Sequence, residues 1–377
     1  MKTLRDIGHL DGVKVLVRAD FNVPMEHGEV VNDFRIRQTL PTIDFLRSKG
    51  AKVILMSHLE TLPGEPATLE PVARRLEKLG VPVMFVKNLR AARELIDNEL
   101  KGSSCMLLEN LRQSPGEKAN DKGFAKELAS LADIYVNDAF SVCHRSHASV
   151  VGVPEFLPSY AGIQLEKEVT NLSKAFTPNH PFLLILGGAK FETKLPLLSR
   201  FMDIADQVFV GGALANDFYK AKGYETGTSL LSKEVPGLKD FMKNPKLILP
   251  PDVIVQDGQA KLCDDLSPTD KIMDDGPQTL AELGKRIDGA RFILWNGPLG
   301  MYENGYKQPT LDLAKLVGAA TGRGATTIVG GGDTLAAIAE LGIEDKFTFV
   351  STGGGAMLDF LAQGTLPGIE ALENAGN

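Results

Sequence analysis

Five short glycine-rich segments stand in the second half of the sequence, each directly after an apolar run. Glycine lets a backbone approach a phosphate closely, and a helix N-terminus after such a loop offers free N–H groups. One glycine pair is typical of an ordinary turn, whereas five at one sheet edge indicate a nucleotide platform. The segments are Gly187-Gly188, Gly211-Gly212, Asn296-Gly297-Pro298, Gly330-Gly331-Gly332 and Gly353-Gly354-Gly355.

Charged side chains accompany these glycines. Lys190 and Lys194 follow the first pair four residues apart, which predicts one shared helix face, although a solvated lysine pair is the alternative. Asp333 and Thr334 follow the triple glycine, where they suit either a helix cap or, for Asp333, a Mg²⁺ ion shared with phosphates. Glu303, five residues past a proline, is a weaker candidate to accept hydrogen bonds from ribose hydroxyls.

Different side chains follow the apolar runs of the first half. Arginines that converge from separate strands present planar donors to carboxylate or phosphate oxygens and stay charged where lysine would not. A small phosphorylated acid therefore suits this half, while a solvated helix face is the alternative for Arg35 and Arg37. The segments are Arg18-Ala19-Asp20-Phe21-Asn22, Ser57-His58-Leu59, Glu109-Asn110-Leu111-Arg112, Asn137-Asp138 and His144-Arg145-Ser146-His147.

Several familiar site types are missing from the sequence. No G-x-x-x-x-G-K-[ST] loop, strand-linked G-x-G-x-x-G or G-x-S-x-G motif occurs, which argues against a P-loop NTPase, a dinucleotide enzyme and an α/β-hydrolase. His144 and His147 lack a third ligand at a suitable spacing for zinc. The three cysteines form no Cys-x-x-Cys pair, so a reducing cytoplasm is the expected location.

The elements that position these residues repeat along the chain as a short apolar run, a polar or glycine loop and an amphipathic stretch. Nearly continuous apolar strands separated by helices predict parallel sheets covered on both faces, in two doubly wound, Rossmann-like α/β domains joined by a helix and hinge. The expected strands are 13–17, 52–56, 81–86, 105–109, 134–136, 182–186, 207–210, 246–249, 291–295, 326–329 and 347–350.

Length and composition agree with a two-domain globular protein. The chain has 377 residues, 43% of them hydrophobic and 24% charged, which is too long for one ordinary core. Its net charge of −7 is not typical of a nucleic-acid binder, and its first residues predict neither a signal peptide nor a membrane span. The expected divisions are residues 1–158, a connecting helix at 159–176, residues 177–357 and a C-terminal segment at 358–377.

Eight collinear motifs resemble the phosphoglycerate kinase family over essentially the entire chain. The resemblance implies reversible phosphoryl transfer from 1,3-bisphosphoglycerate to MgADP, giving 3-phosphoglycerate and MgATP, in a cytoplasmic monomer. It also implies that residues 358–377 pack back on the first domain. The motifs are VLVRADFNVP at 15–24, RIRQTLPTI at 35–43, LLENLR at 107–112, VNDAFSVCHRSHAS at 136–149, GGAKFETK at 187–194, WNGPLGMYE at 295–303, GGGDT at 330–334 and STGGGAMLDFL at 351–361.

The resemblance also implies individual roles, with Lys190, Arg35 and Lys194 as the catalytic residues. Asp333 is the implied magnesium ligand. The expected phosphoglycerate-binding residues are Asp20, Phe21, Asn22, Arg35, His58, Leu59, Arg112 and Arg145. The expected nucleotide-binding residues are Gly188, Lys190, Lys194, Gly212, Asn296, Pro298, Glu303, Gly331, Gly332, Asp333, Thr334, Gly353, Gly354 and Gly355.

One loop departs from the family pattern Ser-His-Leu-Gly-Arg-Pro. Here Glu60 and Thr61 stand where the family has glycine and a substrate-binding arginine, and no arginine follows until Arg74. The departure predicts a raised KM for the acid, and it motivates the alternative of a catalytically impaired nucleotide-binding homologue. Ser141 and Gln113 replace the usual glycine and phenylalanine, and a third hypothesis, an NAD-dependent oxidoreductase, shares only the fold class.

Overall fold

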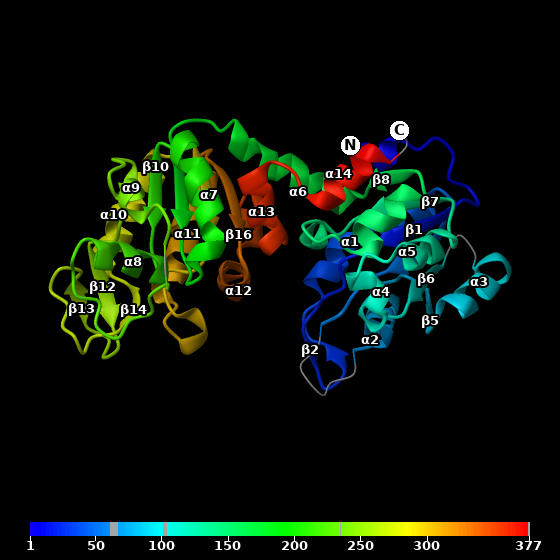
Figure 1. The fold of residues 1–377 in the computed structure, drawn as a ribbon, viewed down its shortest axis with the longest axis horizontal. Coiled ribbons are helices and arrows are strands. Elements are labelled where there is room, and N and C mark those ends of the chain that lie inside the picture. The colour runs from blue at the N-terminus through cyan, green and yellow to red at the C-terminus, as the bar shows by residue number, and fades with distance from the viewer. Residues whose placement is uncertain (61–66, 101–103, 234, 376–377) are drawn as a thin grey trace. The chain divides into compact units, whose positions relative to one another are not determined.

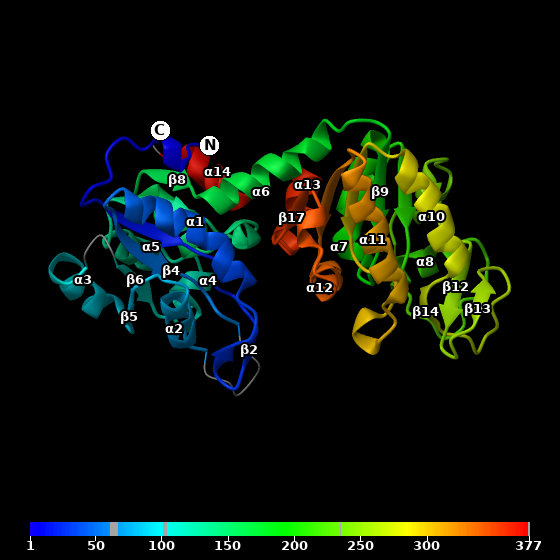
Figure 2. The same ribbon diagram turned by 180° about the vertical axis from the view of Figure 1, so that it is seen from behind.

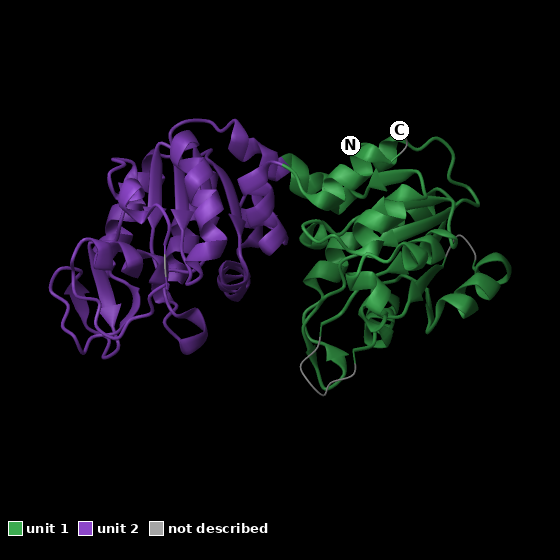
Figure 3. Ribbon diagram, in the orientation of Figure 1, with its two compact units in different colours: residues 1–170, 365–377 green, residues 171–364 purple. Residues whose placement is uncertain are grey.

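The computed structural model describes residues 1–60, 67–100, 104–233 and 235–375. The chain forms two compact units: unit 1 contains residues 1–170 and 365–377, and unit 2 contains residues 171–364 (Figure 3). Each unit is built around a sheet of six parallel strands. Within the described residues, no helix is long and apolar enough to cross a membrane.

The unit 1 sheet has the strand order β5-β6-β4-β1-β7-β8. Its strands are β1 (Lys14–Arg18), β4 (Lys52–Met56), β5 (Val83–Val86), β6 (Cys105–Leu108), β7 (Ile134–Asn137) and β8 (Ser159–Ala161), beside a hairpin of β2 (Met25–Glu26) and β3 (Glu29–Val30). Its helices are α1 (Phe34–Ser48), α2 (Glu70–Lys78), α3 (Leu89–Asn98), α4 (Pro115–Lys118), α5 (Lys122–Ala129) and α14 (Pro367–Asn374), with a π-helical turn at Ala148–Gly152 and α6 (Ile163–Ser173) spanning the division between the units (Figure 1).

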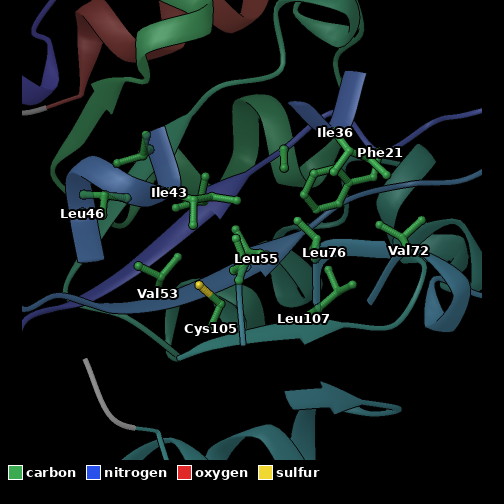
Figure 4. Close-up of a cluster of buried hydrophobic side chains, with 14 of the residues drawn as sticks. Phe21, Ile36, Ile43, Leu46, Val53, Leu55, Val72, Leu76, Cys105 and Leu107 are labelled. Carbon is green, nitrogen blue, oxygen red and sulfur yellow. The ribbon is translucent and has the colours of Figure 1, made fainter. Parts of the chain in front are cut away.

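One face of the unit 1 sheet packs against α1 and α2. Ile43 and Leu46 from α1 and Leu76 from α2 contact the strand residues Val53 and Leu55, all fully buried (Figure 4). These helices place their apolar residues three and four positions apart, so each turns a continuous apolar stripe to the sheet. The packing holds the carboxyl ends of β1 and β4 in register, with Arg18 beside Met56.

The unit 2 sheet has the strand order β11-β10-β9-β15-β16-β17. Its strands are β9 (Phe182–Leu186), β10 (Gln207–Val210), β11 (Leu247–Ile248), β15 (Phe292–Asn296), β16 (Thr326–Gly330) and β17 (Phe349–Ser351), and a separate antiparallel sheet holds β12 (Asp252–Val255), β13 (Ala260–Leu262) and β14 (Ile272–Asp275). Its helices are α7 (Phe191–Ile204), α8 (Ala213–Ala221), α9 (Leu238–Met242), α10 (Pro277–Gly289), α11 (Gln308–Gly322), α12 (Gly332–Leu341) and α13 (Gly355–Gln363), with α10 and α11 together on one face of the sheet (Figure 2).

All eleven predicted strands are present, and six further strands of the described residues are not among them: β2 and β3 of the hairpin, β8, β12, β13 and β14. β8 occupies residues 159–161, which were assigned to the connecting helix, so that helix begins only at Ile163. β12, β13 and β14 were not predicted because all three are short, β12 and β14 contain acidic residues and β13 is largely exposed, so none shows an apolar run. The main parallel sheets follow the hydrophobic pattern because both of their faces are covered.

The C-terminal helix belongs to unit 1. α14 packs against the π-helical turn and β8, and the Gly368 N–H donates to the Cys143 carbonyl over 2.8 Å. The N-terminal amino group lies 3.5 Å from a Glu373 carboxylate oxygen, so both chain ends meet on one side of this unit (Figure 1). The expected boundary at residue 358 falls inside α13, which stays with unit 2, and the chain enters unit 1 again at Thr365.

Candidate functional site

Unit 1 gathers arginine and histidine side chains at the carboxyl ends of three neighbouring strands. Arg18 ends β1, His58 follows β4, and Arg145 lies in the segment after β7. β4 and β7 flank β1 on opposite sides, so this is where the strand order of the sheet reverses, the usual ligand position in open α/β sheets. We call the set formed by Arg18, Arg35, Arg112 and Arg145 the arginine cluster.

The arginine cluster surrounds His58, whose side chain is buried. Burial and the positive charges of Arg18, Arg112, Arg145 and Arg35 hold the pKa of His58 far below its usual range, so the imidazole is neutral. The Arg18 Nη2 lies 3.1 Å from the His58 Nδ1. Because a guanidinium only donates, Nδ1 accepts this hydrogen bond and the ring proton stays on Nε2, where it can serve an anion.

Arg18 itself is a positioning residue. It is 1% exposed and donates from Nε to the Ser149 hydroxyl over 2.8 Å and from Nη1 to the Ala19 carbonyl over 2.6 Å. Ser149 in turn donates to the buried Glu117 carboxylate over 2.6 Å. This chain of contacts satisfies a buried cation through hydrogen bonds, which is the condition for burying it at all.

Asp20 anchors a second network at the mouth of β1. Its Oδ2 accepts hydrogen bonds from Arg35 Nη1 at 3.0 Å and from the Ser141 hydroxyl at 2.6 Å, and its Oδ1 accepts one from the Asn22 N–H at 3.2 Å. Arg35 is thus oriented toward the site and not along a solvated helix face. Arg37 does lie on such a face, since its side chain pairs with Asp33 and is half exposed.

Glu60 lies within the arginine cluster. Its Oε1 is 2.7 Å from Arg112 Nη1 and 3.6 Å from Arg145 Nη1, and its backbone N–H donates to the Asn22 side chain over 2.8 Å. Glu60 therefore places a carboxylate beside two arginines of the cluster. Thr61 lies outside the described residues, and Arg74 pairs with Glu29 at the surface, away from the cluster.

Two residues expected to bind substrate have no side chain available for it. Phe21 and Leu59 are 0% and 1% exposed and belong to the hydrophobic core of unit 1 (Figure 4). Their backbone N–H groups are also engaged, with the Ser57 hydroxyl and the Asn110 side chain respectively. Their place in the motif reflects core packing and loop position, because an apolar residue beside polar ones turns inward.

In unit 2 the glycine loops form one row along the sheet edge. The last strand residues Leu186, Asn296 and Gly330 are direct neighbours in register, so the loops after them begin side by side. The Gly188 N–H donates to the Pro298 carbonyl over 2.8 Å. β10 and β15 flank β9 on opposite sides, so this row also lies where the strand order of the sheet reverses.

Backbone geometry requires glycine at several positions of this row, of which Gly212 and Gly331 are examples. Gly212 has φ +60°, and a Cβ added there would lie 3.0 Å from both the Gly188 nitrogen and the Pro298 oxygen. Gly331 has φ +105°, and a Cβ added there would lie 3.4 Å from the Asn296 Oδ1. Four other expected glycines lie at helix starts: Gly332 is the first residue of α12, and Gly353, Gly354 and Gly355 lead into α13.

The two lysines differ in their surroundings. Lys190 is exposed and stands just before α7 with an extended backbone, so it is not in the helix as expected and shares no helical face with Lys194. Lys194 is buried and donates to the Asn296 side-chain oxygen. Burial lowers the pKa of Lys194 to about 8, while the Asp333 carboxylate acts in the opposite direction.

The surroundings of the Asp333 carboxylate suit the expected magnesium ion. α12 is capped by Gly331 without a side-chain hydrogen bond, so neither Asp333 nor Thr334 serves as its cap. Among the described residues, the Asp333 carboxylate takes part in no hydrogen bond or ion pair, which leaves its oxygens free for a cation. Mg²⁺ usually takes one or two protein carboxylates and completes its shell with phosphate and water oxygens.

Thr334 and Glu303 have different positions. The Thr334 hydroxyl accepts the Gly297 N–H over 3.0 Å and thereby joins two glycine loops. Glu303 lies exposed in the short turn Tyr302–Asn304, and within the described part of the chain no hydrogen bond or ion pair connects its side chain to the glycine row. The geometry therefore supports Thr334 as part of the cradle more strongly than Glu303.

Three contributors to these sites were not predicted as site residues. Arg18 and Ser141 orient His58 and Asp20, and Asp275 accepts the Gly212 N–H over 3.2 Å. Arg18 had a signal in the sequence, since an arginine at the end of an apolar strand must find buried partners. Asp275 had none, because the sequence does not show that the end of β14 meets the loop after β10.

Comparison with known proteins agrees with this arrangement. The family model described as phosphoglycerate kinase matches residues 4–364. Phosphoglycerate kinases of Thermosipho africanus and Moorella thermoacetica are 42% and 43% identical to this chain, covering 99% and 98% of it and 98% of each relative. The alternative of an impaired homologue receives no support from these relatives.

Solved structures give the same result. The structure of phosphoglycerate kinase from Coxiella burnetii matches with a TM-score of 0.84 at 37% identity, over 100% of this chain and 99% of that one. The Pyrococcus horikoshii enzyme matches with a TM-score of 0.84 at 34% identity, over 99% and 98% of the two chains. The fold, the paired anion sites and the full-length similarity together show that this chain belongs to the phosphoglycerate kinase family.

Proposed function

We propose that unit 1 binds the phosphoglycerate and unit 2 binds the nucleotide in the reaction that this family catalyses, phosphoryl transfer between 1,3-bisphosphoglycerate and MgADP. The observation that carries this division is the difference in donors. Unit 1 offers convergent guanidinium groups and an imidazole, which suit a small compact anion. Unit 2 offers a row of glycine loops at helix N-termini, which suits a chain of phosphates.

The reaction requires no general base. The oxygens that exchange the phosphoryl group belong to a carboxylate and a phosphate, and neither must lose a proton to react at neutral pH. Catalysis then depends on alignment and on neutralising the charge of the transferring group. The absence of an Asp-His or Ser-His pair from the proposed roles follows from this chemistry.

Residues of unit 1 hold the acid in this proposal. His58 donates from Nε2 to an anionic oxygen, and Arg112 and Arg145 bind carboxylate or phosphate oxygens. Arg35, held by Asp20, faces the transferring group and neutralises part of its charge. Support comes from the hydrogen bonds that fix Arg35 and His58 before any ligand is bound.

Residues of unit 2 hold the nucleotide. The N–H groups at the N-termini of α12 and α13 and the Lys194 ammonium bind phosphate oxygens, and Lys190, which is exposed, follows the transferring phosphoryl group. Asp333 would hold Mg²⁺, which supplies positive charge to the phosphate oxygens when it is bound. Asn296 orients Lys194 through the hydrogen bond that connects them.

Direct transfer requires the bound acid and the bound nucleotide to meet with water excluded, so we propose that the units close on each other during each cycle. We also propose that the protein acts as a monomer in the cytoplasm on these small molecules, in agreement with its buried thiols and the family resemblance. A gel-filtration mass of one chain at working concentrations is the expected result.

A coupled assay with 1,3-bisphosphoglycerate and ADP tests the proposed function. We expect ATP and 3-phosphoglycerate in equal amounts, and dependence on added Mg²⁺. An impaired homologue would bind ADP without turnover, which calorimetry on the same preparation would reveal. Titration of each ligand with the other absent tests whether the acid binds to unit 1 and the nucleotide to unit 2, because a substitution in one unit should weaken only one of the two ligands.

A further inference from the structure

Glu60 joins two arms of the arginine cluster through one carboxylate. Its Oε1 contacts Arg112 Nη1 at 2.7 Å and Arg145 Nη1 at 3.6 Å. Burial raises the pKa of Glu60, but the charges of Arg112 and Arg145 outweigh that effect and lower it below its usual value. The carboxylate is therefore ionised at neutral pH, and in the free protein it stands where an anionic ligand would meet these two arginines.

The contact leaves Arg112 incompletely paired. Its side chain is only 11% exposed, and its Nε and Nη2 atoms are buried without a hydrogen-bond partner among the described residues. Buried donors without partners cost free energy, so a guanidinium in this state favours a ligand that brings more acceptor oxygens. A carboxylate or phosphate group of the substrate brings two or three, whereas Glu60 supplies one.

Glu60 can leave without disturbing the core. Its side chain is 52% exposed, and its backbone N–H is held separately by the Asn22 side chain. Rotation of the side chain would release both arginines while the loop stays in place. The family resemblance places a glycine at this position, which has no side chain to compete.

We propose that Glu60 is an intramolecular competitor of the substrate, occupying Arg112 and Arg145 in the free protein and giving way to an anionic group of the phosphoglycerate. The proposal rests on the proposed function, because it takes unit 1 as the acid site. Glu60 thereby lowers the affinity of unit 1 for the phosphoglycerate.

The test is calorimetric titration of 3-phosphoglycerate into the full-length protein without nucleotide. Glu60→Gln keeps the side-chain size but removes the charge, and should lower the dissociation constant by up to about 5-fold, the range for displacing a partly exposed ion pair. Glu60→Asp keeps the charge and should bind no more tightly than the wild type. Glu127→Gln, which removes a carboxylate from the exposed pair with Arg93, is the matched control and should change nothing.

Unchanged or weaker binding by Glu60→Gln would overturn the proposal, since Glu60 would then organise the arginines and not compete for them. Equal tightening in Glu60→Asp would overturn it too, because charge would not be the cause. Circular dichroism and thermal melts establish that each variant is folded. The titration needs no turnover, so a wild type that binds 3-phosphoglycerate but fails in the coupled assay would contradict the proposed function alone.

Discussion

The two anion sites of this protein neutralise negative charge by different means. In unit 1 the cations come from side chains that already have partners, as Arg35 does with Asp20 and Arg112 with Glu60. In unit 2 much of the positive potential comes from backbone N–H groups, and Lys190 and Asp333 have no side-chain partner among the described residues. One site is assembled by ion pairs between loops, the other by close packing of glycine loops.

The difference shows how each site tolerates change. A cluster of guanidinium groups keeps its charge at any physiological pH, so its affinity depends on which carboxylates compete for it. A cradle of glycine loops depends on backbone conformation, and its buried lysine depends on pH. Substitutions should therefore separate the two sites by ligand, by pH and by backbone strain.

The largest expected effect comes from removing the unpaired lysine of unit 2. Lys190→Ala should lower kcat about 100- to 1,000-fold with little change in nucleotide KM, the usual loss for one donor that acts on the transition state. Steady-state kinetics with ADP and 1,3-bisphosphoglycerate provide the measurement. Lys243→Ala, which alters an exposed lysine paired with Asp240, should have normal kinetics, and an unchanged kcat in Lys190→Ala would refute its role.

In unit 1 the corresponding change is Arg112→Ala. We expect the KM for 3-phosphoglycerate to rise about 10- to 150-fold, because a charge-assisted hydrogen bond contributes about 1.5–3 kcal/mol. Nucleotide KM should stay within about twofold. Arg112→Lys keeps the charge without the planar fork and should fall between the wild type and alanine. An equal rise in the KM values of both ligands would contradict the assignment of each ligand to its own unit.

A pH series distinguishes the cations of the two sites. Since burial lowers the pKa of Lys194 to about 8, kcat/KM for the nucleotide should fall about tenfold per pH unit above that value as the ammonium deprotonates. The acid site, with arginines and a neutral histidine, should show no such limb. In Lys194→Gln this fall of kcat/KM at high pH should disappear. If it persists, another group is responsible for it.

The lowered pKa of Lys194 affects stability in the opposite direction, because stability should rise with pH where kcat/KM falls. Between about pH 8 and the usual lysine pKa of 10.5, the unfolded chain binds more protons at Lys194 than the folded one does. The contribution of Lys194 to the free energy of unfolding therefore increases as pH rises through this window. The stability difference between the wild type and Lys194→Gln, from urea titrations at several pH values, should move in this direction.

The smallest expected effect concerns backbone strain in the glycine row. Gly212→Ala should destabilise the protein by about 1–2 kcal/mol because alanine is strained at a positive φ, and it should also weaken ADP binding. Gly223→Ala is the matched control, since Gly223 has φ +83° with nothing within 4 Å of an added Cβ. Both variants should lose stability in thermal melts, but only Gly212→Ala should lose ADP affinity in titration.

Much of the fold follows from local patterns. The eleven apolar runs became the strands of two parallel sheets, since a strand covered on both faces must be apolar throughout. β8 and the small sheet of β12, β13 and β14 could not be predicted from the sequence, because strands of three or four residues with polar or acidic members show only a weak hydrophobic pattern. The connecting helix was expected from residue 159 but starts at Ile163 for the same reason.

The site residues show the same division. Their identities follow from the sequence, because loops after parallel strands meet at one edge and the motifs resemble a known family. Phe21 and Leu59 show the limit of this reasoning, because their side chains turn into the core.

By itself the sequence determined the strand series, the glycine loops and the types of charge that each half offers, since these depend on composition and spacing along the chain. Only the tertiary structure decided which charges meet. That Glu60 reaches Arg112, fifty-two positions away, or that Arg18 fixes the ring proton of the buried His58 on Nε2, depends on distances between the ends of different strands. Electrostatic interactions follow separation in space, and residue spacing along a folded chain does not specify it.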